Sequence, residues 1–118
     1  RHVNNSGNQN QNQRSLNVLY ATILGAFYRN YRNVTLFTII DTIEPDVILL
    51  PETWLDSSIN NTELQAAFLD FDIFRLDRLH RRGGGVLAAN KRHIQCSVIN
   101  INSSLEILFL SCKNSYPP

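Results

Sequence analysis

The chain lacks any apolar run that approaches the roughly 20 residues a helix needs to cross a lipid bilayer. It also lacks an excess of charge of either sign, because 11 Lys and Arg residues stand against 10 Asp and Glu residues, for a formal net charge of +1. The composition therefore predicts no membrane partner. It does not by itself argue for nucleic acid, so any such site must rest on local clustering of basic residues.

Cysteine is scarce as well. Cys96 and Cys112 lie sixteen residues apart, and the chain has no C-x-x-C pair. Two cysteines alone cannot complete a zinc site. Because both lie in apolar stretches, we expect them to be small buried thiols in a protein of a reducing compartment.

What is present is enough for one domain at most. The 118 residues are 43% hydrophobic, which is ordinary for a globular chain. Residues 1–13 (RHVNNSGNQNQNQ) bury too little apolar surface to offset the entropy lost on ordering, so we expect a disordered tail. The chain begins with Arg and ends with two prolines, and we therefore expect a fragment of a longer protein.

Apolar periodicity predicts two helices before the first strand. One apolar stripe covers residues 16–31, with Ser15 as its N-cap, and a second covers residues 36–43 and ends before Pro45. Residues 47–50 form a short, wholly apolar run, which predicts a strand covered on both faces.

The pattern in the rest of the chain predicts one short helix and several strands. Thr62 and Gln65 fit a capping box at the start of the helix, and residues 71–74 fit a strand. Three more apolar runs predict strands that share one sheet with residues 47–50, with a turn at 102–104 between the last two. These runs are residues 86–89, 94–101 and 105–111. The order of elements predicts an α/β layered fold.

Three motifs follow one another within residues 46–89. They are ETWLDSSI at 52–59, FRLDR at 74–78 and RGGGVLAA at 82–89. Together they resemble the endonuclease domain of non-LTR (LINE-type) retrotransposons, which belongs to the endonuclease/exonuclease/phosphatase superfamily. The resemblance continues weakly to residue 118. It implies that residues 14–118 are the N-terminal part of such a domain, a partial four-layer α/β sandwich of the deoxyribonuclease I-like type.

Glu52 is the first candidate for a functional residue. It follows the apolar run at 47–50 after Pro51, and ligands gather at the carboxyl ends of strands in open α/β sheets. The alternative is an ordinary surface Glu that opens a loop. In the resembled family the Glu of this motif binds a divalent metal, so the resemblance implies that Glu52 is a ligand of Mg²⁺, with Mn²⁺ as a substitute.

The resemblance implies two further catalytic residues near the ends of the chain. Asn12 matches the Asn of the family's first strand, which joins the metal and phosphate network, although no apolar strand precedes it here. Tyr116 matches a Tyr whose phenol donates to the scissile phosphate. The alternatives are one more Asn of a polar tract and an ordinary terminal Tyr.

A basic cluster precedes the three glycines of the third motif. Arg75, Arg78, Arg81 and Arg82 carry guanidinium groups that suit phosphate oxygens, which predicts contacts with the DNA backbone. The alternative is a solvated loop. Trp54 and Leu55 are predicted to pack in the core rather than to stack on bases.

The family completes its site with a later Asp-Asn motif and a C-terminal Asp-His pair, and neither occurs in these residues. The resemblance thus implies a fragment of a metal-dependent endonuclease that hydrolyses DNA phosphodiester bonds and is inactive alone. Its partners would be DNA, the missing C-terminal half and a reverse transcriptase domain, and its location intracellular, in the nucleus when it acts on genomic DNA. The alternatives are a non-enzymatic remnant that serves as an interaction module, and a phosphatase of the same superfamily.

Overall fold

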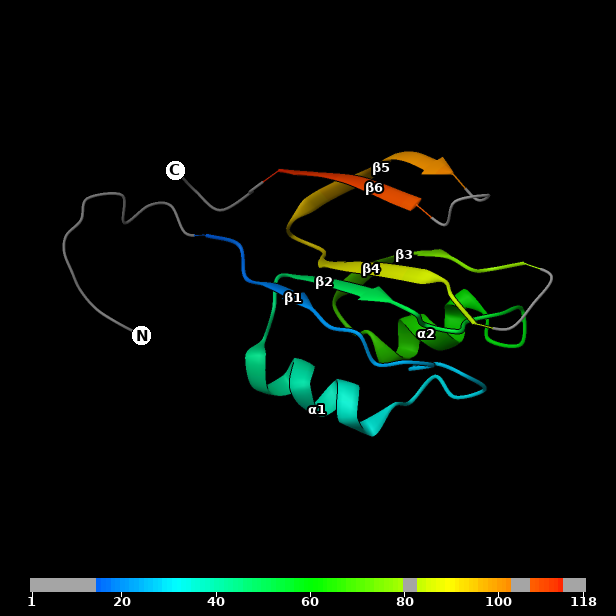
Figure 1. Ribbon diagram of the computed structural model, residues 1–118. Helices are drawn as coiled ribbons and strands as arrows, with labels where there is room; N and C mark the ends of the chain where they lie inside the picture. Colours follow the sequence, from blue (N-terminus) through cyan, green and yellow to red (C-terminus); the bar gives the residue numbers. More distant parts are fainter. Residues whose placement is uncertain (1–14, 80–82, 103–106, 114–118) are drawn as a thin grey trace, which may run out of the picture.

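The computed structural model describes residues 15–79, 83–102 and 107–113. Its elements are β1 (Val18–Tyr20), α1 (Val34–Ile43), β2 (Val47–Pro51), α2 (Asn61–Ala67), β3 (Phe71–Leu76), β4 (Val86–Lys91), β5 (Gln95–Asn102) and β6 (Ile107–Lys113). Four strands form a mixed sheet in the order β1-β2-β4-β3, and β5 pairs with β6 in a separate sheet. Figure 1 shows both helices on one side of the four-stranded sheet and the β5–β6 ribbon on the other. The fold is α/β, as the sequence predicts.

The predicted helix before the first long strand is confirmed as α1. It begins after Asn33, whose side-chain oxygen accepts a hydrogen bond of 2.9 Å from the backbone N–H of Leu36. It ends at Glu44, which adopts the left-handed conformation directly before Pro45. The helix carries the chain from β1 to β2, which run parallel and therefore need a crossover connection. None of the described helices is long and apolar enough to span a bilayer.

The predicted helix over residues 16–31 is wrong. Residues 18–20 form β1, and residues 24–29 form turns that carry Phe27 into the core, where it is 0% exposed. The turns are held by long-range backbone bonds, from Gly25 N–H to the carbonyl of Glu52 (2.9 Å) and from Phe27 N–H to that of Thr53 (2.9 Å). The helical spacing of apolar residues arises because a strand and a turn each contribute core side chains, and tertiary contacts override the local pattern.

β2 is covered on both faces, as its apolar sequence predicts. Val47, Ile48 and Leu50 are 6%, 0% and 2% exposed. Ile48 and Leu50 belong to the core between sheet and helices, and each such burial stabilises the fold by about 1.5–3 kcal/mol. Because side chains alternate along a strand, Val47 faces the other side of the sheet.

α2 and β3 form where the sequence places them, although the cap differs. The capping box is made by Asn60 and Glu63, whose side chains bond each other's backbone N–H at 2.8 and 3.0 Å, and not by Thr62 and Gln65. Gln65 instead donates to the carbonyls of Phe68 and Phe71, and so ties the end of α2 to β3.

The prediction that residues 94–101 and 105–111 share a sheet with β2 is wrong. β4 pairs antiparallel with β2 on one side and with β3 on the other, so both of its edges are occupied. A tight turn, closed by Ile94 N–H on the carbonyl of Lys91 (2.9 Å), then directs the chain into β5, which pairs with β6. The predicted connecting turn lies largely outside the described residues.

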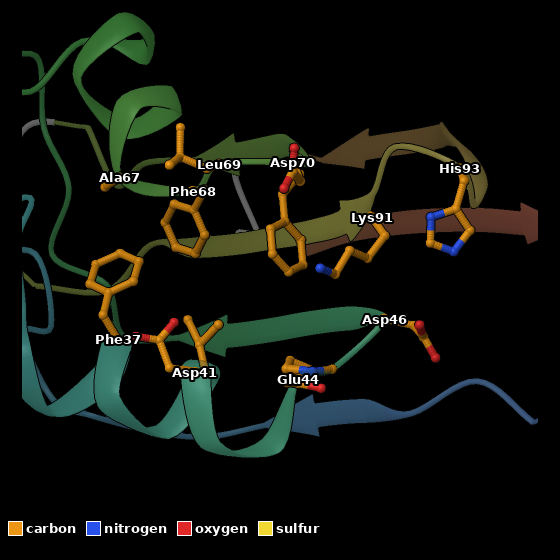
Figure 2. A pocket seen from close by; sticks show the side chains of 13 residues that line it. Phe37, Asp41, Glu44, Asp46, Ala67, Phe68, Leu69, Asp70, Lys91 and His93 are labelled. Atoms are coloured by element: carbon orange, nitrogen blue, oxygen red, sulfur yellow. The ribbon is translucent and has the colours of Figure 1, made fainter.

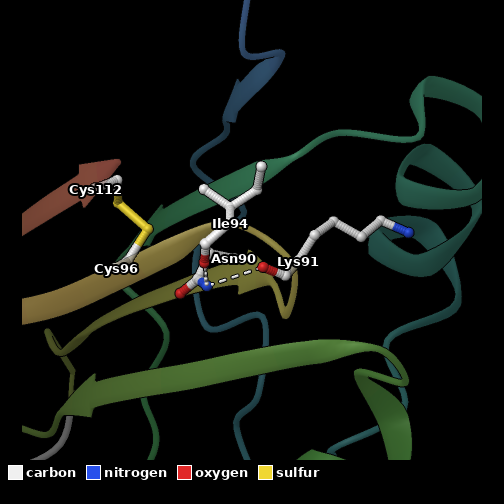
Figure 3. Close-up of a disulfide and its surroundings, with 5 residues drawn as sticks. All are labelled: Asn90, Lys91, Ile94, Cys96 and Cys112. Atoms are coloured by element: carbon white, nitrogen blue, oxygen red, sulfur yellow. Dashed lines mark hydrogen bonds between the residues drawn. A yellow bond between two sulfur atoms is a disulfide. The ribbon is translucent and has the colours of Figure 1, made fainter. Parts of the chain in front are cut away.

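Cys96 and Cys112 stand opposite each other in the β5–β6 register and form a disulfide (Figure 3). The expectation of two free buried thiols is therefore wrong, and its inference of a reducing compartment loses its basis. The spacing of the two cysteines could not reveal this bond, because pairing requires facing Cβ atoms and depends on strand register.

Candidate functional site

Glu52 follows β2 directly, at the carboxyl end of that strand. β1 runs parallel to β2, so both strands end at the same edge of the sheet. The Glu52 side chain is half-buried. We call the edge formed by the ends of β1 and β2 the Glu52 edge.

The backbone at this edge adopts an uncommon conformation. Glu52 and Trp54 have φ of 57° and 59°, in the left-handed region that non-glycine residues rarely adopt. Such residues cost about 1–3 kcal/mol each and persist only where the surroundings hold them. They often lie at functional sites, which makes this segment a candidate on structural grounds independent of any motif.

Backbone hydrogen bonds hold the segment from both sides. The turn at 24–29 supplies the two bonds that reach the carbonyls of Glu52 and Thr53. From the other side, Thr53 and Trp54 donate to the carbonyls of Gly85 (3.2 Å) and Gly84 (2.9 Å). The glycines of the third motif therefore position residues 52–54. These glycine carbonyls accept hydrogen bonds, and they cannot bind the oxygens of a phosphate, which are acceptors too.

Trp54 contacts both Glu52 and a neighbouring aromatic side chain. Its indole Nε1–H donates to Oε1 of Glu52 at 3.3 Å, while its ring meets Tyr28 edge-on with ring centroids 5.7 Å apart. Trp54 is half-buried, whereas Leu55 is buried as expected. The predicted packing role of Trp54 does not include this hydrogen bond. A donor-bearing ring two residues from a candidate carboxylate is the signal that could have indicated it.

Arg78 lies at the same edge. A Cβ atom placed on Gly83 would lie 3.3 Å from Nη1 of Arg78 and 3.8 Å from Nε1 of Trp54, so both groups border this glycine. The guanidinium of Arg78 is thereby brought close to the indole that contacts Glu52. Residues of all three sequence motifs meet at the Glu52 edge.

Arg75 has a different environment. Its guanidinium is largely buried and pairs with the carboxylate of Asp77. Its remaining donors reach the carbonyls of Asp56 (3.0 Å) and Ile59 (2.7 Å) and the side-chain oxygen of Asn61 (3.3 Å). Arg75 thus joins the loop after Trp54 to β3, and a phosphate contact would have to replace these bonds.

Asn12, Arg81, Arg82 and Tyr116 lie outside the described residues. The roles predicted for these four residues therefore stay predictions.

The first strand that the structure describes is β1, which begins after Asn12. Ala21 N–H still bonds to the carbonyl of Leu49 at 3.2 Å, so Thr22, which is exposed, is the first residue beyond the pairing. Thr22 therefore lies at the end of β1, at the Glu52 edge, and its hydroxyl is a further candidate for a polar contact at this site that was not predicted from the sequence. The apolar run at 18–20 indicates β1 and hence the place of Thr22, but the helical stripe over residues 16–31 concealed it.

The donor set at this edge restricts the metals that it could hold. Within the part of the chain that the structure describes, no three or more His, Cys, Asp or Glu side chains gather to hold an ion. A calcium site, which takes six to eight oxygens, does not fit. Mg²⁺ keeps several waters and uses one or two carboxylates with substrate phosphates, and Glu52 fits that requirement.

One acidic group near the site has a shifted pKa. The hydroxyl and the backbone N–H of Ser58 both donate to Oδ1 of Asp56, at 2.5 and 2.8 Å. These bonds stabilise the carboxylate and lower the pKa of Asp56, with smaller contributions from Arg29 and Arg75. Asp56 is exposed and shapes the turn after Leu55.

A groove of about 580 Å³ lies at the other end of the sheet, between the C-terminal part of α1 and the start of β3 (Figure 2). Phe37, Phe68 and Phe71 line it, and Lys91 lies with its Nζ 5.0 Å from the centroid of the Phe71 ring. None of the predicted site residues that the structure describes, which are Glu52, Arg75 and Arg78, lines this groove.

Comparison with known proteins returned no match, neither to a family model nor to a curated protein or a solved structure.

Proposed function

We propose that this chain is the N-terminal part of a divalent-metal-dependent endonuclease domain of the LINE type, with a deoxyribonuclease I-like sandwich as its complete fold. One observation carries the proposal: the three motifs of the resemblance meet around Glu52. Trp54 comes from the first motif, Arg78 from the second and the three glycines from the third.

In this proposal Glu52 holds Mg²⁺, or Mn²⁺ as a substitute, through its carboxylate. When bound, the ion polarises the scissile phosphate and stabilises the leaving oxygen. Arg78 lies close enough to the Glu52 edge to contact a phosphate there, and Arg81 and Arg82 extend the same basic segment. Arg75 keeps the loop after Trp54 in place.

The chain alone lacks a general base of the kind the family uses. A positioned base contributes a factor of about 10²–10⁴ in rate, and the remaining electrostatic groups contribute more. We therefore assign DNA cleavage to a longer protein that joins this segment to the Asp-Asn and Asp-His motifs.

The test uses that longer protein and nicking of supercoiled plasmid DNA in Mg²⁺. Glu52→Gln keeps the shape of the side chain and removes its charge, and it should abolish most nicking. Glu44→Gln is the matched control, because the same change is made to an exposed acid at the other end of the sheet. Full activity of Glu52→Gln would overturn the proposal. A parent protein that binds metal and DNA but never nicks would favour the non-enzymatic alternative.

A further inference from the structure

We propose that Trp54 is a positioning residue for Glu52: its indole N–H holds one carboxylate oxygen and thereby presents the other to a divalent cation. The inference rests on the proposed role of Glu52 as a metal ligand. It adds a residue that does not itself touch the metal.

The local backbone makes this contact. The residue between them, Thr53, is wholly buried, whereas Glu52 and Trp54 are half-buried on the exposed side of the segment. The left-handed conformation of both residues brings their side chains together, with Nε1 of Trp54 3.3 Å from Oε1 of Glu52. An extended segment would hold side chains two residues apart roughly 7 Å from each other.

The indole ring is confined by its neighbours. A Cβ atom on Gly25 would lie 3.2 Å from Cδ2 and Cε3 of Trp54, and one on Gly83 would lie 3.8 Å from Nε1. Tyr28 meets the ring edge-on. The ring thus lies against two glycines and one aromatic side chain, and a donor held in this way directs its hydrogen bond at a fixed point.

The chemistry of the donor decides which oxygen is used. An indole N–H can only donate, so it selects Oε1 as an acceptor and cannot compete for a cation. Among the residues that the structure describes, the Trp54 N–H is the hydrogen-bond donor to this carboxylate, and it uses Oε1. In the proposal Oε2 is the oxygen presented to the ion. Groups that orient a metal ligand typically change metal affinity by about 10–100-fold when they are removed.

The experiment measures metal binding by this chain, with Mn²⁺ as the probe. Trp54 is the sole tryptophan, so its fluorescence reports on the Glu52 edge alone. Mn²⁺ is paramagnetic and quenches nearby indoles. We expect saturable quenching that excess Mg²⁺ reverses and that Glu52→Gln abolishes. If quenching is absent, or if Glu52→Gln quenches like the parent, Glu52 holds no ion, and both the metal assignment and this inference fail.

The second measurement removes the N–H alone. Replacing Trp54 by its benzothiophene analogue keeps the shape of the ring and removes the donor, and Trp54→Phe serves as the genetically encoded version. Titration of free Mn²⁺ by electron paramagnetic resonance should give a dissociation constant about tenfold higher in both. Glu44→Gln, which removes an exposed charge at the other end of the sheet, is the control and should bind Mn²⁺ like the parent.

The outcomes separate the two claims. If the benzothiophene variant binds Mn²⁺ as tightly as the parent while Glu52→Gln does not bind, the metal assignment stands and the positioning role is overturned. Thermal melts of all variants identify any that fail to fold. Because the analogue is isosteric, it keeps the test decisive even if Trp54→Phe unfolds.

Discussion

A Cβ atom on Gly85 would lie 2.8 Å from the side-chain oxygen of Thr53, closer than real Cβ contacts come. Gly85 also has a φ of 83° and accepts the backbone hydrogen bond of Thr53 at 3.2 Å. The third motif therefore fits against the first only because this position has no side chain. The backbone conformation of Glu52 depends on that fit.

The first prediction follows from this contact. Gly85→Ala should lower the free energy of unfolding by about 2–4 kcal/mol, because the left-handed backbone and the overlap with Thr53 each carry a cost. Chemical denaturation measures the change. Thr53→Ala removes the overlapping oxygen, so the Gly85→Ala penalty should be smaller in that background. Equal penalties in both backgrounds would show that the contact with Thr53 does not matter.

Local patterns were sufficient for part of this fold. α1 could be predicted because its apolar stripe and the following Pro both act within one segment, whereas its cap at Asn33 was not predicted. β2 could be predicted because both of its faces are apolar, and the position of Glu52 at its end follows from its length.

The errors arise where distant segments decide the outcome. β1 was missed because its pairing with β2 depends on residues about 29 positions away, as in the bond of 2.8 Å from Asn17 N–H to Asp46. The role of Arg75 could not be predicted, because two of its acceptors are backbone carbonyls, which any residue carries. The disulfide required a strand register that no local pattern encodes.

The second prediction concerns Cys96 and Cys112. The bond closes a loop of about sixteen residues, and a loop of that size is expected to stabilise the folded state by about 3 kcal/mol. Reduction by a dithiol should therefore lower the free energy of unfolding by roughly that amount. The double variant with both cysteines changed to Ala should be equally destabilised and should not respond to reductant. A parent that melts identically with and without reductant would contradict the disulfide.

The third prediction concerns pH and Asp56. Hydrogen bonds from Ser58 lower the folded-state pKa of Asp56 below its ordinary value of 3.8. Their contribution to stability is therefore present above pH 3.8 and is lost as the pH falls through the folded pKa. Ser58→Ala should raise the pKa of Asp56 toward 3.8, as measured by NMR titration of the carboxyl carbon. An unchanged pKa in this variant would indicate that Ser58 does not hold the carboxylate.

The fourth prediction separates two neighbouring arginines. Arg75→Ala should lower the free energy of unfolding by about 2 kcal/mol, because it leaves the Asp77 carboxylate and the carbonyls of Asp56 and Ile59 without their partner. Arg78→Ala should change stability less, because the proposed function assigns the Arg78 guanidinium to a phosphate at the Glu52 edge. Denaturation of the two single variants makes the comparison. Equal decreases in stability would mean that both arginines serve mainly the fold.

For DNA affinity we expect the opposite order, with a larger loss from changes at Arg78 than from a change at Arg75. We expect weak binding without sequence preference, which falls steeply with salt because phosphate contacts release counterions. Changing Arg78, Arg81 and Arg82 together to Ala should remove most of the affinity and reduce the salt slope by up to about 0.9 for each phosphate that is no longer neutralised. Arg75→Lys is the matched control, because it keeps the charge and removes the fork that holds the loop, so it should affect stability more than affinity. Fluorescence anisotropy with a labelled duplex at several salt concentrations measures both quantities. If the triple variant binds as tightly as the parent with the same salt slope, the basic segment makes no phosphate contact and the DNA-binding part of the proposed function is excluded.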